Sequence, residues 1–358
     1  MRPPLVDWDL AAATATRLAR PGPVVDRAVA VETVRQLRSL AVEAESHVRS
    51  VTGMSDEESP APATVLDRPG WIEANVAGFR TLVDPLTEEL FAERTPPAQA
   101  LGAVGSRITG VQVGGLLAYL SGRVLGQYEV FLPEGQGAGR LTLVAPNIVA
   151  TETRLGVDPR DFRLWVCLHE VTHRVQFRAV PWLREHIRGE ITAFVRASDL
   201  DPAALFGRLR AASGQLAAAV TGRGELSLIE AVQTPEQRVV LDRLTGLMSL
   251  VEGHAEYVMD VIGPDVIPSV GQLRARFEAR RREGNPFERA LRRLLGIELK
   301  MRQYAEGARF VRAAVDQVGM TGFNRVWTSS ATLPDAGEIR DPDRWLARMA
   351  DVPPAAVG

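Results

Sequence analysis

Residues 164–173 read Leu-Trp-Val-Cys-Leu-His-Glu-Val-Thr-His, an apolar run that ends in the pattern His-Glu-x-x-His. We expect this run to be helical, because Asp158 is a good N-cap and Pro159 suits the first helical position. Residues four apart lie on one face of a helix, so His169 and His173 can present two imidazoles to one cation. The stretch therefore predicts a metal-binding helix.

The predicted metal is zinc, which accepts imidazole nitrogens at about 2.0–2.1 Å and keeps one position for water in catalytic sites. Glu170 follows His169 and can take a proton from that water, which is the general-base role in metal-assisted hydrolysis. The alternative is a solvated helix face with two unrelated histidines. Residues 164–168 argue against it, because their apolar character indicates burial and buried imidazoles need partners. Arg174 adds a charge directly after the second histidine, facing either the edge of a lobe or the cleft.

The composition narrows the class of protein. A chain of 358 residues with 46% apolar residues exceeds one typical domain, so we expect two lobes that share one sizeable core. The net charge of −2 gives no electrostatic case for binding nucleic acid or an anionic membrane. The sequence has no run of 18 apolar residues, so no membrane span is expected. The expected partner is a peptide or a small amide substrate, and the oligomeric state is left open.

The chain has one cysteine, Cys167, so no disulfide can form within it, as in a reducing cytoplasm. Residues 1–23 have no apolar signal core, which also favours a cytoplasmic location. Positions 167 and 169 do not share a helix face, so we expect Cys167 to be a small core residue rather than a zinc ligand.

The pattern along the chain predicts a mainly α-helical fold with a small antiparallel sheet. Apolar residues recur at helical spacing before a polar, proline-containing stretch at 52–64. We therefore expect an N-terminal helical region and linker at 1–64. The catalytic domain should span 65–358 and include an inserted helical segment at about 181–234. A further long helix is expected to start at Pro235 and end at Gly263-Pro264.

The sheet is predicted from a hairpin pattern. Residues 124–131 and 141–144 favour strands, and the glycine-rich residues 134–139 between them favour a turn. Peptidases commonly bind an extended substrate by adding it to a sheet edge. Because this sheet directly precedes the metal helix, we expect an edge strand of the cleft at 141–145, with Ala145 and Asn147 contacting the substrate.

Two histidines and a water do not complete a catalytic zinc site, so a third protein ligand is needed. Glu252, Glu256 and Asp260 are each four apart and form an acidic stripe within an apolar context, which a cation would neutralise. Members of the stripe that do not bind zinc, Glu256 or Asp260, would orient a histidine ligand. The alternatives are a solvated acidic face and a competing ligand, His254, which lies about 200° round the helix from Glu252.

The His169-Glu170-x-x-His173 pattern followed by the downstream segment Glu252-Gly253-His254-Ala255-Glu256-Tyr257 resembles the gluzincin metallopeptidases. In the aminopeptidase branch of that group, a Glu-Gly-Phe-Ala segment supplies the third zinc ligand. The resemblance therefore implies that Glu252 is the ligand, with His254 standing where phenylalanine is usual.

More closely, nearly the whole chain is similar to a family of zinc-dependent metalloproteases or hydrolases whose substrate is unknown. One subgroup of that family is labelled as associated with biosynthesis of the deazaflavin redox coenzyme. The resemblance implies a mostly helical, zincin-like fold. The segments that carry it are 126–128, 145–148, 169–177, 252–260, 298–304, 333–334 and 338–339.

A hydrolase also needs a donor that stabilises the oxyanion, and gluzincins often use Tyr, His or Arg. On the predicted helix 298–318 we expect Tyr304 to be this donor, with Arg302 next. The alternative is a surface ladder of ion pairs that includes these residues.

Three functions remain open at this point: a metallopeptidase, a zinc-stabilised scaffold that binds a partner, and a hydrolase of a non-peptide amide linked to coenzyme assembly. A scaffold does not need Glu170, so this residue separates catalysis from scaffolding.

Overall fold

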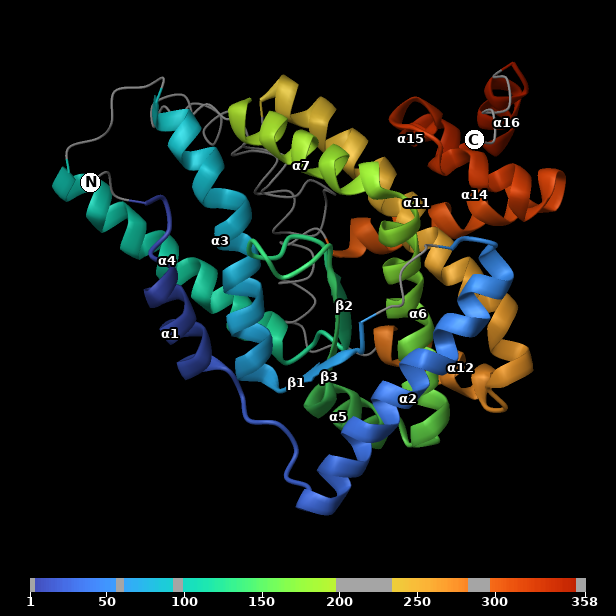
Figure 1. Ribbon diagram of the computed structural model, residues 1–358, viewed down its shortest axis with the longest axis horizontal. Coiled ribbons are helices and arrows are strands. Elements are labelled where there is room, and N and C mark those ends of the chain that lie inside the picture. Colours follow the sequence, from blue (N-terminus) through green and yellow to red (C-terminus); the bar gives the residue numbers. More distant parts are fainter. Residues whose placement is uncertain (1–3, 56–60, 93–98, 198–233, 283–296, 352–358) are drawn as a thin grey trace. The chain divides into compact units, whose positions relative to one another are not determined.

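The computed structural model describes residues 4–55, 61–92, 99–197, 234–282 and 297–351. These residues form a mainly helical fold with a small three-stranded sheet, as predicted (Figure 1). None of the described helices is long and apolar enough to span a membrane.

Contacts between residues divide the chain into two compact units, one of residues 1–179 with 258–276 and one of residues 180–257 with 277–358. The described elements of the first unit are α1 (Trp8–Leu18), α2 (Arg27–Thr52), β1 (Thr64–Leu66), α3 (Arg68–Ala92), α4 (Gln99–Ser121), β2 (Gly126–Glu129), β3 (Arg140–Val144), α5 (Ala145–Leu155) and α6 (Pro159–Ala179). The helices α11 (Pro235–Val266) and α12 (Val270–Arg282) each belong in part to both units. The second unit also has α7 (Pro181–Arg196), α14 (Ile297–Phe323), the 3-10 turns η1 (Asn324–Trp327) and η2 (Ser330–Thr332), α15 (Ala336–Arg340) and α16 (Pro342–Ala350). The predicted boundary at 64/65 stays a prediction.

The sheet has the strand order β1-β3-β2, in which β2 pairs with β3 antiparallel and β1 pairs with β3 parallel. The predicted hairpin is confirmed, but the sheet is mixed because β1, which begins at the last residue of the predicted linker 52–64, also pairs with β3. A strand of only three residues is too short to give a periodic signal. The prediction of an edge strand at 141–145 is wrong, because β3 lies in the middle and β2 and β1 are the edges.

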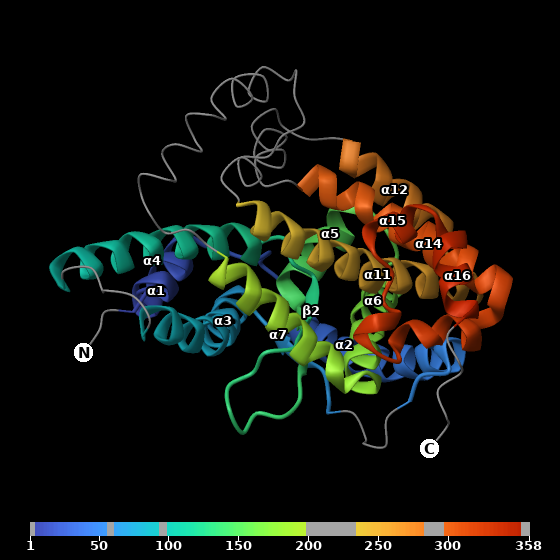
Figure 2. The ribbon, with the colours of Figure 1, turned by 90° about the horizontal axis from the view of Figure 1, so that it is seen from above.

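The metal helix α6 lies against α2 and against the edge strand β2 (Figure 1). Its core-facing side chains, among them Phe162, Leu164 and Leu168, have no exposed surface. A second cluster of the same unit joins α1, α3 and α4, where Trp8, Trp71 and Leu117 are buried. Figure 2 shows these three helices side by side, as Figure 1 does. The contacts of α6 with α2, β2 and β3 all lie within the first unit.

The long helix α11 differs from the prediction at its C-terminal end. It continues through Gly263 and Pro264 to Val266, and the amide of Ile267 still donates to the carbonyl of Gly263 at 2.9 Å. A proline removes one helical hydrogen bond, which costs less in a last turn than in a helix interior. The C-terminal helices form the core of the second unit, where Trp345 is fully buried and its Nε1 donates to the carbonyl of Thr332 at 2.9 Å.

Candidate metal centre

Helix α6 begins as its sequence predicts. The Asp158 carboxylate accepts the amide of Asp161 at 3.0 Å, and Pro159 is the first helical residue. The carboxylate of Asp161 in turn accepts the Ser269 amide at 2.9 Å and its hydroxyl at 2.6 Å, which ties the start of α6 to the segment before α12. The helix ends at Ala179, just before Pro181 opens α7. Both ends of the metal helix are therefore fixed.

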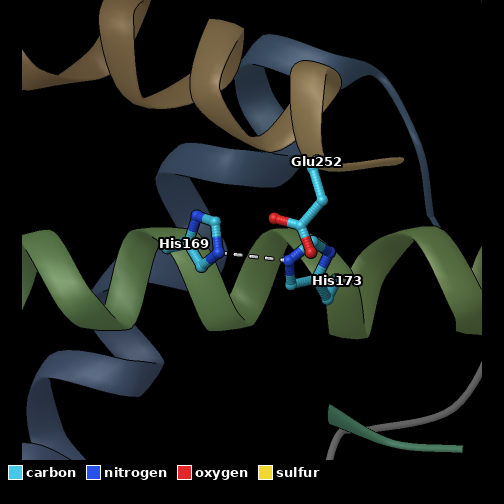
Figure 3. A group of neighbouring side chains, drawn as sticks. All are labelled: His169, His173 and Glu252. Atoms are coloured by element: carbon cyan, nitrogen blue, oxygen red, sulfur yellow. Dashed lines mark hydrogen bonds between the residues drawn. The ribbon is translucent and has the colours of Figure 1, made fainter. Parts of the chain in front are cut away.

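The two histidines of α6 present their Nε2 atoms to one point. His169 Nε2 and His173 Nε2 lie 3.3 Å apart, and the two rings are nearly perpendicular, with an interplanar angle of 87° (Figure 3). Two nitrogens bound at about 2.0–2.1 Å to a tetrahedral zinc ion would be roughly 3.3–3.4 Å apart. The observed separation is thus that of one edge of a zinc coordination tetrahedron.

Glu252 of α11 completes a group of three potential ligands. One carboxylate oxygen of Glu252 and one nitrogen of each histidine all lie within 4.8 Å of one another, and Figure 3 shows the carboxylate directed at the rings. Among the described residues, this is the one group of three or more His, Cys, Asp and Glu side chains that could hold a metal ion. Two imidazoles and one carboxylate are a common donor set of catalytic zinc sites, so the residues present fit the ion that the sequence predicts.

The position of Glu252 depends on a close helix crossing in the second unit. A Cβ atom built on Gly307 of α14 would lie 1.9 Å from the Ser249 carbonyl oxygen, and one built on Gly253 would lie 2.2 Å from the Gly307 carbonyl carbon. Only glycine allows this approach of the two backbones. The crossing holds α11 at the residue that directly follows Glu252.

Gln176 orients His173, and it was not among the site residues predicted from the sequence. Its Oε1 lies 2.9 Å from His173 Nδ1, and Gln176 is fully buried. An amide oxygen only accepts hydrogen bonds, so Nδ1 carries the proton and the lone pair of Nε2 is left for a metal. A glutamine three residues after His173 was the signal that could have revealed this role, because residues three apart are neighbours on a helix surface.

Glu170, the predicted general base, is 7% exposed and lies beside β2. Burial raises the pKa of the neighbouring Cys167 thiol, and the Glu170 charge raises it further. The thiol therefore stays protonated, and the prediction that Cys167 is a core residue is confirmed by its complete burial.

We expected the acidic stripe on α11 to be buried because its neighbours in the sequence are apolar. None of its three residues, Glu252, Glu256 and Asp260, is buried. Glu256 is exposed, and Asp260 forms an ion pair with Arg274 of α12. The Nδ1 partner of His173 is Gln176 and not one of these carboxylates, and for His169 the prediction that Glu256 or Asp260 orients a histidine stays a prediction.

The alternative ligand His254 is not in the metal group. It is fully buried, and its ring lies 5.5 Å from the ring centroids of both Phe323 and Trp327. Its position two residues after Glu252 turns it toward these aromatic side chains of the second unit. His254 is therefore a core residue.

Asn147 has a structural role instead of the predicted contact with substrate. The residue is 2% exposed; its Oδ1 accepts Arg68 Nε at 2.8 Å, and its Nδ2 donates to the carbonyls of Ser121 and Val124, each at 2.7 Å. All of these bonds are made within the fold, so the amide is not available to a ligand. Ala145 begins α5 at the end of the central strand.

Arg174 points away from the histidines toward α2, where its guanidinium pairs with the buried Glu45 carboxylate. Burial lowers the pKa of Arg174, and the Glu45 charge partly offsets this effect. The pair fastens α2 to the residue that follows His173. The side chains of Arg302 and Tyr304, our predicted oxyanion donors, lie outside the described residues, so this prediction stays open.

A His-Glu-x-x-His helix with a third carboxylate on a distant helix is the arrangement of metal-dependent hydrolases of the zincin class. The chain belongs to the zincin-like metallopeptidase family, whose model matches residues 6–346. It is also similar to a crystal structure described as a "putative hydrolase with a novel fold" from Chloroflexus aurantiacus. That similarity has 33% sequence identity and a TM-score of 0.70, and it covers 97% of this chain and 100% of the other. A comparison with curated proteins gives no match.

Proposed function

We propose that this protein is a zinc-dependent hydrolase that cleaves a peptide or amide bond. The observation that carries the proposal is the closeness of three potential ligands. His169 Nε2 and His173 Nε2 lie 3.3 Å apart, and a carboxylate oxygen of Glu252 and a nitrogen of each histidine all lie within 4.8 Å of one another. The separation of the nitrogens matches zinc, and membership of the metallopeptidase family supports hydrolysis.

In this proposal His169, His173 and Glu252 hold the ion. When bound, zinc supplies a Lewis acid that polarises a carbonyl group and lowers the pKa of water toward about 7. Glu170 lies about 100° round α6 from His169 and only about 60° from His173, so its carboxylate flanks the face that carries the ligands. A Glu170 carboxylate oxygen takes the proton of the attacking water and then returns it to the leaving amine.

The proposed substrate position is the outer edge of β2, which replaces the edge strand that we expected at 141–145. The Val144 amide donates to the Leu125 carbonyl at 2.8 Å, so the backbones at 125, 127 and 129 pair with β3. The amide and carbonyl groups of Gly126 and Tyr128 therefore point away from β3. Within the described part of the chain β2 pairs with no other strand, and an extended peptide could add there, next to Glu170.

Metal analysis and one substitution test the proposal. The purified protein should bind one zinc ion per chain and hydrolyse members of a peptide or small-amide library. Glu170→Gln should keep the zinc and lose turnover by about 100-fold or more, because it removes the base and none of the ligands. His169→Ala should lose both. Hydrolysis by Glu170→Gln at the rate of the unaltered protein would refute the mechanism.

The same experiment separates the two alternatives. A zinc-stabilised scaffold would bind zinc and hydrolyse nothing, and the Glu170→Gln variant would then behave like the unaltered protein in every assay. A hydrolase of a non-peptide amide linked to coenzyme assembly would act on small amides and leave peptides intact. Peptide hydrolysis that depends on zinc and on Glu170 would exclude both.

A further inference from the structure

We propose that Gly126 is a positioning residue for the catalytic base: the absence of a side chain at 126 creates the space in which the Glu170 carboxylate sits. This inference rests on the proposed function, in which Glu170 is the base. It assigns a role to a residue of β2 that is neither a metal ligand nor a group that exchanges protons.

The contact itself is short. A Cβ atom built on Gly126 would lie 2.7 Å from Glu170 Cγ and 2.9 Å from Glu170 Cδ. It would also lie 3.0 Å from a methyl carbon of Leu143, which is fully buried on the neighbouring strand. Carbon atoms are in favourable contact at about 3.5–4.0 Å, so any side chain at 126 would overlap with the stem of Glu170.

The backbone gives no other reason for a glycine at this position. The positive φ angles of the described chain occur at other glycines, such as Gly135 and Gly137 in the hairpin turn, and Gly126 is not among them. Alanine could adopt the strand conformation of residue 126 without strain. Glycine also weakens a strand interior, so its presence here points to a close approach by another group.

Two contacts oppose a movement of the strand away from Glu170. Residue 126 is paired with Leu143 of β3, and two residues later the Tyr128 ring stacks on Phe177 of α6, with ring centroids 5.9 Å apart. These contacts hold β2 on β3 and on the helix that carries Glu170. A methyl group at 126 would therefore displace the Glu170 side chain rather than the strand.

The displacement would change the base and leave the metal ligands in place. The three atoms nearest to a Cβ at 126 belong to Glu170 and Leu143, and none of them belongs to His169 or His173. Gly126→Ala should therefore bind zinc normally and lose about 100-fold in kcat, the loss that a misplacement of roughly 1 Å produces at a reacting group.

A double-mutant cycle on melting temperature tests the contact without relying on activity. Gly126→Ala is made in the unaltered protein, in Glu170→Gln, which keeps Cγ and Cδ, and in Glu170→Ala, which removes them. We expect Gly126→Ala to lower the melting temperature by about 2–6 °C in the first two backgrounds, the effect of overpacking in a chain of this size. In the Glu170→Ala background it should be neutral or stabilising, because the two closest atoms are gone and the third, a methyl carbon of Leu143, is at the end of a flexible side chain.

An equal loss of melting temperature in all three backgrounds would overturn the proposal, and so would no loss in any of them. If Gly126→Ala alone does not fold, the double variant with Glu170→Ala should fold, and failure of both would overturn it as well. If the loss of melting temperature disappears in the Glu170→Ala background but the unaltered protein hydrolyses nothing, the steric role of Gly126 stands and the proposed function is refuted. Zinc content measured in each variant excludes loss of metal as the cause.

Discussion

Replacing Gln176 by leucine should weaken zinc binding, although Gln176 does not contact the ion in the proposed site. The side chain of Gln176 is fully buried, and its Oε1 lies 2.9 Å from His173 Nδ1. His173 is itself only 8% exposed, so water has little access to take over the lost hydrogen bond. Leucine has a similar volume and cannot accept a hydrogen bond, so the Nδ1 proton would be left buried without an acceptor.

The size of the effect follows from two estimates. A buried donor that loses its acceptor costs about 1–3 kcal/mol. Removing the outer hydrogen bond of a histidine ligand lowers metal affinity by about 10–100-fold. A factor of ten corresponds to about 1.4 kcal/mol, so the loss of 10–100-fold in zinc affinity is about 1.4–2.8 kcal/mol, which lies within the range of the first estimate.

The assay is a competition titration against a zinc indicator dye at fixed pH, which gives the dissociation constant directly. Gln176→Glu keeps an acceptor and should bind zinc at least as tightly as the unaltered protein. Gln136→Leu, at an exposed position of the hairpin turn, serves as the matched control and should have no effect. A Gln176→Leu protein that folds and binds zinc with unchanged affinity would show that Gln176 does not orient His173.

Two further predictions concern the packing around the site. Replacing Glu45 by leucine removes the carboxylate that pairs with the buried Arg174, and it should lower the free energy of unfolding by about 3–5 kcal/mol in urea titrations. Adding Arg174→Met to this variant should recover much of the loss. If the losses of the two single variants add up in the double variant, the two side chains do not act as a pair. Asn147→Leu removes the three hydrogen bonds of the Asn147 amide and should lower the free energy of unfolding by about 3 kcal/mol in the same titrations, while zinc affinity stays unchanged. A raised KM with unchanged stability would instead indicate that Asn147 contacts the substrate.

The local features of the metal helix were predictable because they depend on neighbours in the sequence. The N-cap at Asp158, the first-turn Pro159 and the shared face of His169 and His173 follow from helical geometry alone. The hairpin of β2 and β3 was predictable for the same reason, since a glycine-rich turn and two short apolar runs lie next to each other.

Features that depend on tertiary contacts were not predictable. β1 pairs with β3 across more than 70 positions of the sequence, and its three residues have no pattern of their own. The acidic stripe on α11 looked uniform in the sequence, yet Asp260 pairs with Arg274 and Glu256 is exposed. Asn147 looked available for a substrate because its three partners come from distant segments. The spacing of residues in the sequence cannot predict which polar side chains form hydrogen bonds or ion pairs within the folded protein.

The burial of Cys167 has a practical consequence for spectroscopy. The chain contains a single thiol, it is fully buried, and its raised pKa keeps it unreactive in the folded protein. A second cysteine introduced at an exposed position would be modified selectively, so a spin label or fluorophore could be attached without first deleting Cys167. Paired with a paramagnetic ion in place of zinc, such a label would give distances from the metal to any chosen point on the surface.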